Sequence, residues 1–139
     1  MKKSIITAAT IVLSIGVATA QHLKEAQVPA AVKENVKKEF TSSKVTGWEM
    51  EGTNYEAHLM LNKAESSALL SPDGKLIETE SEIAITALPK AATEYLAKMY
   101  KGDKIKEAAK IVTVAGKTTY EAEIKGKDIL FDDKGNLLK

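Results

Sequence analysis

The sequence of 139 residues contains no cysteine and no arginine. Without cysteine, the folded chain has no disulfide and must rely on its core for stability. Without arginine, it has no guanidinium group to form bidentate hydrogen bonds with phosphate or carboxylate. Aromatic residues make up only 5% of the chain and include a single tryptophan, so few large rings are available to the core.

Long apolar runs are also lacking, because the one apolar stretch, residues 5–17, is short for a membrane span. This stretch follows two lysines and precedes Ala-Thr-Ala at residues 18–20, which is typical of a signal peptide and its cleavage site. We therefore predict that residues 1–20 are removed after Ala20 on export through the bacterial inner membrane. The protein would then be periplasmic or secreted, without stable membrane insertion; an uncleaved anchor is the alternative.

The net charge excludes some partners. After the first 20 residues the chain holds 18 lysines and 19 acidic residues, a net charge of −1. This balance argues against nucleic acid or an anionic membrane as the partner. The remaining 119 residues lie within the usual range for a single domain.

What the sequence does have is a pattern that repeats after about sixty residues. Apolar residues at helical spacing, each set led by a proline, predict helices over residues 28–40 and 88–100. Strands with alternating apolar and polar residues follow, built around Tyr-Glu-Ala at 55–57 and at 120–122. This spacing is too long for a solenoid repeat and fits a duplicated module of helix and strands.

The repeat defines the expected fold. Each half comprises a helix and about four antiparallel strands, which predicts an α+β fold in which a helix covers one face of an antiparallel sheet. We expect one duplicated domain over residues 21–139, with repeats at about 28–83 and 88–139. No Gly/Pro-rich linker separates them at 81–87, so the strands form either one continuous sheet or two abutting ones. Residues 21–27 are a polar lead-in that we expect to be mobile.

Groups that carry out catalysis are scarce. His22 lies in the polar lead-in and His58 on the polar side of a predicted strand. The sequence has no G-x-S-x-G, H-E-x-x-H or Walker pattern. Two acidic turns, at 71–74 and 132–136, lack the oxygen ligands that a calcium loop needs. We therefore expect no enzymatic activity, no cofactor and no bound metal.

The polar face of the central strands is the candidate docking surface, because the helices should leave it uncovered. The candidate residues are Trp48, Glu56, His58, Met60, Glu121 and Glu123. Their neighbours in the alternation, Tyr55, Leu59, Tyr120 and Ile124, should be core. Trp48 has two interpretations: it packs beneath the first helix, or it joins a methionine on the open face as an interaction anchor.

The Pro-led helices, the Tyr-Glu-Ala strands and the glycine turns after a signal peptide resemble the PepSY-like secreted proteins of Bacteroidetes, a β-lactamase-inhibitor-like family. The resemblance covers about residues 29–138. It implies a tandem helix-plus-sheet fold, similar to β-lactamase inhibitory protein and to the PepSY modules of peptidase propeptides. It also implies a non-catalytic role in inhibiting or regulating an envelope enzyme. The chain departs from those inhibitors, which hold each repeat with a disulfide, and it matches none of their inhibitory loop residues.

These observations together predict a secreted, non-enzymatic module that docks a protein partner, such as an envelope hydrolase or peptidase, on its open sheet face. One alternative is a periplasmic carrier with a pocket for a small ligand or peptide. Another is a structural component of the envelope. A large apolar pocket would favour the carrier, whereas a broad, shallow sheet face would favour the protein binder.

Overall fold

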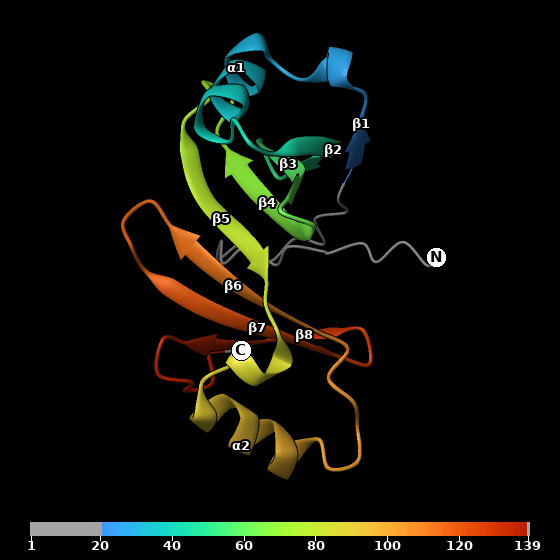
Figure 1. Cartoon of the computed structure of the whole chain (residues 1–139), viewed down its shortest axis with the longest axis vertical. Coiled ribbons are helices and arrows are strands. Elements are labelled where there is room, and N and C mark those ends of the chain that lie inside the picture. Colours follow the sequence, from blue (N-terminus) through green and yellow to red (C-terminus); the bar gives the residue numbers. More distant parts are fainter. Residues whose placement is uncertain (1–20, 139) are drawn as a thin grey trace.

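Eight strands form a single antiparallel sheet in which every strand pairs with its neighbours in chain order (Figure 1). The computed structural model describes residues 21–138, so the predicted signal peptide and its cleavage point lie outside the described residues. The strands are β1 (Gln21–Leu23), β2 (Lys44–Glu51), β3 (Asn54–Leu61), β4 (Ala64–Leu70), β5 (Leu76–Glu82), β6 (Glu107–Thr113), β7 (Thr118–Ile124) and β8 (Lys127–Asp132). Because β5 pairs directly with β6, the sheet is continuous, which is the first of the two arrangements predicted.

Two helices, α1 (Ala30–Glu39) and α2 (Lys90–Met99), confirm the predicted helical segments with slightly later starts and earlier ends. Short 3₁₀ turns, Glu25–Gln27 and Ile85–Ala87, precede them. Pro29 and Pro89 stand immediately before the helices, with φ of −54° and −55°. Proline suits this position because its fixed φ is compatible with a helix start and its missing N–H would have no helical partner.

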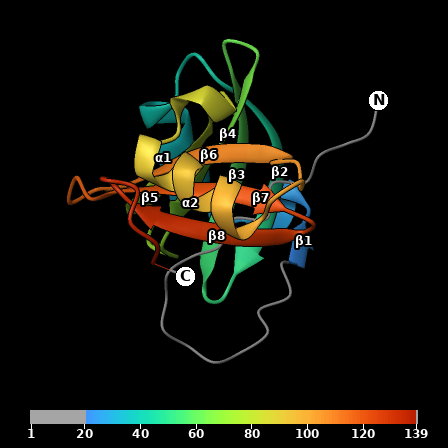
Figure 2. The ribbon, with the colours of Figure 1, turned by 90° about the horizontal axis from the view of Figure 1, so that it is seen from below.

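Each helix covers its own core, and the two helices lie at opposite ends of the longest axis (Figure 1). Seen from below in Figure 2, α2 lies across β6, β7 and β8. The first core contains Val28, Val32, Val36, Trp48, Ala57, Leu59, Ala68 and Leu70. The second contains Leu88, Ala92, Leu96, Ala108, Ala122, Ile124, Ile129 and Phe131.

The predicted alternation on the central strands is confirmed. Leu59 and Ile124 are 2% and 1% exposed in the two cores, with Tyr55 and Tyr120 packed against them half-buried. Cross-strand partners keep the same alternation, since Ala57 opposes Ala68 and Ala122 opposes Ile129. Because successive side chains point to opposite faces, the polar residues between them lie on the face away from the helices.

We call the face away from the helices the inner face. We predict from the sequence that it is open to water or to a partner, and the structure differs from open exposure to water at the central positions of the strands. Leu69, Ile111 and Leu130 lie on this face and are only 3–4% exposed, although no helix covers them.

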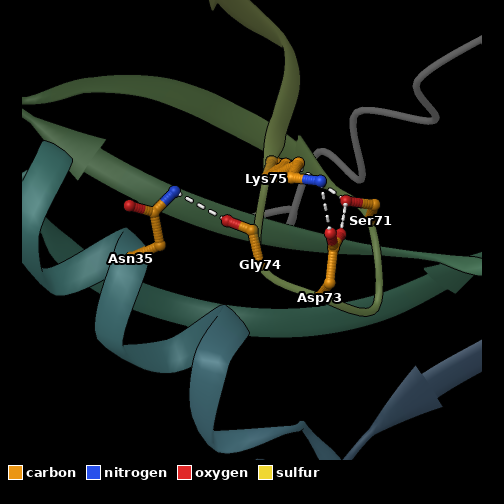
Figure 3. A network of polar contacts seen from close by, with 5 residues as sticks. All are labelled: Asn35, Ser71, Asp73, Gly74 and Lys75. Carbon is orange, nitrogen blue, oxygen red and sulfur yellow. Dashed lines mark hydrogen bonds and ion pairs between the residues drawn. The ribbon is translucent and has the colours of Figure 1, made fainter.

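A glycine turn fixes each helix against its half of the sheet. Gly74, in the turn before β5, has φ +85°, and a Cβ there would lie 2.5 Å from the carbonyl oxygen of Ala31 in α1. The side-chain amide of Asn35 donates a hydrogen bond of 2.7 Å to the Gly74 carbonyl, as Figure 3 shows. In the second half Gly135 has φ +87°, and a Cβ there would lie 2.7 Å from the backbone nitrogen of Ala92.

The lead-in is ordered, so the prediction that it is mobile is wrong. Its first three residues form β1, which pairs with β2 in the register Gln21–Met50, His22–Glu49 and Leu23–Trp48. Leu23 packs against the first core, which fixes this register. No pattern in the sequence predicts this strand, because three residues are too few to show a period.

Candidate functional site

Acidic side chains gather on the inner face of the sheet. Strand register places twelve of them there: Glu49, Glu51, Glu56, Glu65, Glu78, Glu80, Glu82, Glu107, Glu121, Glu123, Asp128 and Asp132. We call these twelve residues the acidic face. The chain has 19 acidic residues in all, so more than half of its negative groups share one surface.

Three carboxyl groups of the acidic face are buried with an oxygen that has no hydrogen-bond partner. They are Glu56 (Oε1), Glu80 (Oε1) and Glu121 (Oε2), and these residues are 3%, 4% and 5% exposed. A buried polar atom without a partner costs about 1–3 kcal/mol, and a charged one costs more. Such groups are retained at the expense of stability, which marks this face as a candidate site.

Burial changes the protonation of these carboxyl groups. Loss of solvation, together with the neighbouring carboxylates, raises the pKa of Glu121 to about 9 and that of Glu80 to about 8. Loss of solvation also raises the pKa of Glu56 to about 7, although a hydrogen bond from Ser67 opposes the shift. At neutral pH Glu80 and Glu121 therefore retain their protons, and a nearby cation would favour their release.

Lys106, immediately before β6, contributes positive charge beside the acidic face in the second half. Its Nζ lies 3.0 Å from Glu123 Oε1 and 3.6 Å from Glu107 Oε1, while its side chain stays about half exposed. A hollow of about 220 Å³ opens here, and its lining includes Glu80 and Glu121. The hollow is small and mostly acidic, which suits a cationic side chain better than an apolar ligand.

Two histidines flank the acidic face in the first half. Glu49 Oε1 lies 2.8 Å from His22 Nδ1 and 3.6 Å from His58 Nε2. Glu49 also faces Glu56 directly across β2 and β3. Sequence reasoning missed Glu49 and assigned His22 no role, because both depend on β1, which it did not predict.

The structure brings most of the predicted site residues onto one face. Glu56 and Glu121 are buried within it, Glu123 is half-buried beside Lys106, and His58 is half-buried beside Glu49. Met60 is half-buried at the end of β3, opposite Lys44 and Glu65.

Trp48 lies on the other face. It is 6% exposed in the first core, so the interpretation that it packs beneath the first helix is confirmed, and the interpretation that it anchors the open face is wrong. Its cross-strand partner is Ala57, which faces α1, and the register of β2 shifts between Val45 and Gly47, just before it.

Shallow hollows also lie between each helix and the sheet. One, of about 620 Å³ beside α1, is lined in part by Phe40 and Trp48. The other, of about 470 Å³ beside α2, is lined in part by Tyr100 and Ile105. Because the two hollows occupy matching places, they follow from the fold rather than from a single specialised site.

The fold defines an α+β protein of the β-lactamase-inhibitor-like type, an eight-stranded antiparallel sheet with two helices. The chain belongs to the family described as "Putative beta-lactamase-inhibitor-like, PepSY-like", whose model matches residues 17–78 and 67–139. The resemblance noted in the sequence is thereby confirmed. No curated protein matches the chain.

Solved structures from Bacteroides share this fold. A chain from Bacteroides eggerthii, described as one of the "putative periplasmic proteins", has a TM-score of 0.72 at 17% identity, over 81% of this chain and 86% of that one. A DUF2874 family protein from Bacteroides uniformis has a TM-score of 0.71 at 16% identity, over 81% and 87%. A BLIP-like protein from Bacteroides fragilis has a TM-score of 0.58 at 21% identity, over 80% and 84%.

Within the part of the chain that the structure describes, no helix has the length and apolarity needed to cross a bilayer.

Proposed function

We propose that this protein is a non-enzymatic module of the bacterial periplasm that binds a protein partner through its acidic face. The partner would present a segment rich in lysine or arginine and would be an envelope enzyme, such as a peptidase or another hydrolase, that the module inhibits or regulates. The observation that carries the proposal is the gathering of twelve acidic residues on one sheet face, where Lys106 contacts two of them, Glu107 and Glu123.

Charge complementarity supports a cationic partner. The buried oxygens of Glu80 and Glu121 have no hydrogen-bond partner, and a lysine or arginine side chain entering the hollow would supply one. Half-buried members of the face, among them Glu78 and Glu123, are accessible to a docking protein. Complementary charges of this kind favour the choice of partner and the rate of association more than raw affinity.

The family supports the general role. Its description is inhibitor-like, and the solved structures with this fold include periplasmic-type and BLIP-like proteins.

Matching features in the two halves support the proposal that the domain is a duplicated module. Each half has a proline before its helix, a helix over its own core and a glycine turn beneath that helix. The carrier alternative rests on the hollow beside α1, whose lining is partly apolar. A second hollow in the matching place beside α2 weakens this alternative.

The test is capture of the partner from a periplasmic extract with matched charge variants as bait. The face variant is Glu78→Lys with Glu123→Lys, and its control is Glu34→Lys with Glu94→Lys on the exposed sides of the helices. Both variants change the net charge equally, and circular dichroism checks that both fold. The purified partner should bind the face variant at least about tenfold more weakly than the unmodified protein, with the control unchanged.

Equal binding by the unmodified protein and both variants would contradict the acidic face as the docking surface. A captured partner with an acidic contact surface would contradict the predicted chemistry of the partner.

A further inference from the structure

We propose that Glu49, Glu56 and His58, joined by His22, form a binding site for a divalent transition-metal ion of the zinc type. The site lies where β1, β2 and β3 adjoin, in the first half of the acidic face. It goes beyond docking of a protein partner, because it needs no partner and involves one half of the molecule only.

The distances suit a compact metal ion. One ligand atom from each of Glu49, Glu56 and His58 lies within 4.8 Å of the others. Zinc bonds of about 2.0–2.2 Å in a tetrahedron set ligand atoms about 3.3–3.6 Å apart. Glu49 Oε1 and His58 Nε2 are already 3.6 Å apart.

His22 can serve as the fourth ligand after a small movement. Its Nδ1 lies 2.8 Å from Glu49 Oε1, which is hydrogen-bond distance and slightly closer than two ligands of one metal. Its side chain is 74% exposed, so the ring has room to move outward by the few tenths of an ångström required.

Burial supplies a second, independent observation. Glu56 Oε1 is buried without a hydrogen-bond partner, and the residue is 3% exposed. Glu49 is also 3% exposed and stands directly opposite Glu56 in the strand register, where two like charges destabilise a sheet. A divalent ion bound by both carboxylates would convert this repulsion into shared coordination.

The donor set selects the class of metal. Imidazole nitrogen combined with carboxylate oxygen suits zinc, copper and nickel. Calcium prefers six to eight oxygen ligands, and magnesium keeps several waters in an octahedral shell. Two histidines among four candidate ligands therefore favour a transition metal.

The second half provides a natural control. The residues that match Glu49, Glu56 and His58 in strand position are Ala109, Glu121 and Glu123. This set has no imidazole, and Glu123 is paired with Lys106. The same inner face therefore carries the full donor set in the first half only.

The test is zinc titration of protein purified from the periplasm without a polyhistidine tag. Calorimetry of the unmodified protein should show one zinc equivalent, and the ring-proton NMR signals of both His22 and His58 should shift in step with it. His58→Ala should weaken zinc binding by about tenfold or more, as should Glu49→Gln. Glu123→Gln in the second half should leave it within about twofold, and millimolar calcium should not displace the zinc.

Absence of a stoichiometric heat, or histidine signals that stay in place, would overturn the site. So would zinc binding that survives His58→Ala, or that falls equally in Glu123→Gln, because either result assigns the ion to the acidic face in general. If a variant fails to fold by circular dichroism, the histidine signals of the unmodified protein decide the question.

Discussion

The two halves of the molecule share a framework but fill it differently. In the first core Trp48 and Leu70 are both buried, whereas the matching positions of the second hold Ala108 and Phe131. The large ring of the first core, Trp48, is on the strand that follows the helix. The large ring of the second core, Phe131, is on the last strand. Cores tolerate such exchanges when the total volume is kept.

The side-chain contact that holds each helix against the sheet also differs between the halves. Asn35 of α1 and Tyr95 of α2 occupy equivalent positions in their helices. Asn35 donates a hydrogen bond to the Gly74 carbonyl. The ring of Tyr95 instead packs edge-on against the ring of Phe131, with 5.8 Å between the ring centroids. The backbone arrangement is thus common to both halves, while a polar contact holds one helix and an aromatic contact holds the other.

The largest expected effect tests whether the halves are one cooperative unit. Leu59→Ala and Ile124→Ala, one in each core, should each lower the free energy of unfolding by about 2–5 kcal/mol. Because β5 and β6 join the halves in one sheet, urea unfolding should remain a single transition in both variants. Val114→Ala, at a side chain that is 66% exposed, should change stability by no more than about 0.5 kcal/mol. Two separated transitions would contradict the single unit.

The next effect tests whether both glycine turns are equally constrained. Gly74→Ala and Gly135→Ala combine a positive φ with a close backbone contact and should each cost about 2–4 kcal/mol. Gly102→Ala is the control: its φ is +86°, but a Cβ there would meet nothing within 4 Å, so it should cost only about 1–2 kcal/mol. Equal losses in all three would mean that the contact with the helix contributes little.

The outcome of the sequence-based predictions has a physical explanation. The alternation from Tyr55 to Leu59 assigned side chains to the correct faces, because alternation depends on local backbone geometry. It could not show that Glu56 and Glu121 are buried, because burial depends on the three-dimensional surroundings of a strand and not on alternation along it. The place of Trp48 likewise depended on the register of β2, which neighbouring strands decide.

The pH dependence of stability should come mainly from the carboxyl groups of the acidic face. Burial raises the pKa of Glu121 to about 9 and that of Glu80 to about 8, so the folded state keeps protons that the unfolded state loses above about pH 4.5. The free energy of unfolding should therefore fall as the pH rises from 5 to 9. Glu121→Gln should remove part of this fall and stabilise the protein at pH 9 by a few kcal/mol.

Thermal unfolding at pH 5, 7 and 9 measures this dependence, and Glu34→Gln on the exposed side of α1 is the control that should follow the unmodified protein. Stability that rises steadily over this range would show that Glu80 and Glu121 are ionised in the folded state.

The smallest effect concerns Lys106, which joins Glu107 and Glu123 in the second half only. Lys106→Met should lower the thermal midpoint only slightly, because exposed ion pairs contribute little. A double-mutant cycle with Glu123→Gln isolates the pair, and its coupling should shrink as salt is added. A large coupling energy that is insensitive to salt would show that the pair of Lys106 and Glu123 is less hydrated than the exposure of the two side chains indicates.

The two outer strands of the sheet have a consequence for solubility. β1 covers only three residues of β2, and beyond β8 a single bridge joins Phe131 to Leu137. An uncovered strand edge offers unpaired amide and carbonyl groups to strands of other molecules. If β1 came away, the eight residues of β2 would become such an edge, and copies of the protein could add to one another. The three-residue strand β1 thus protects the edge of the sheet from aggregation.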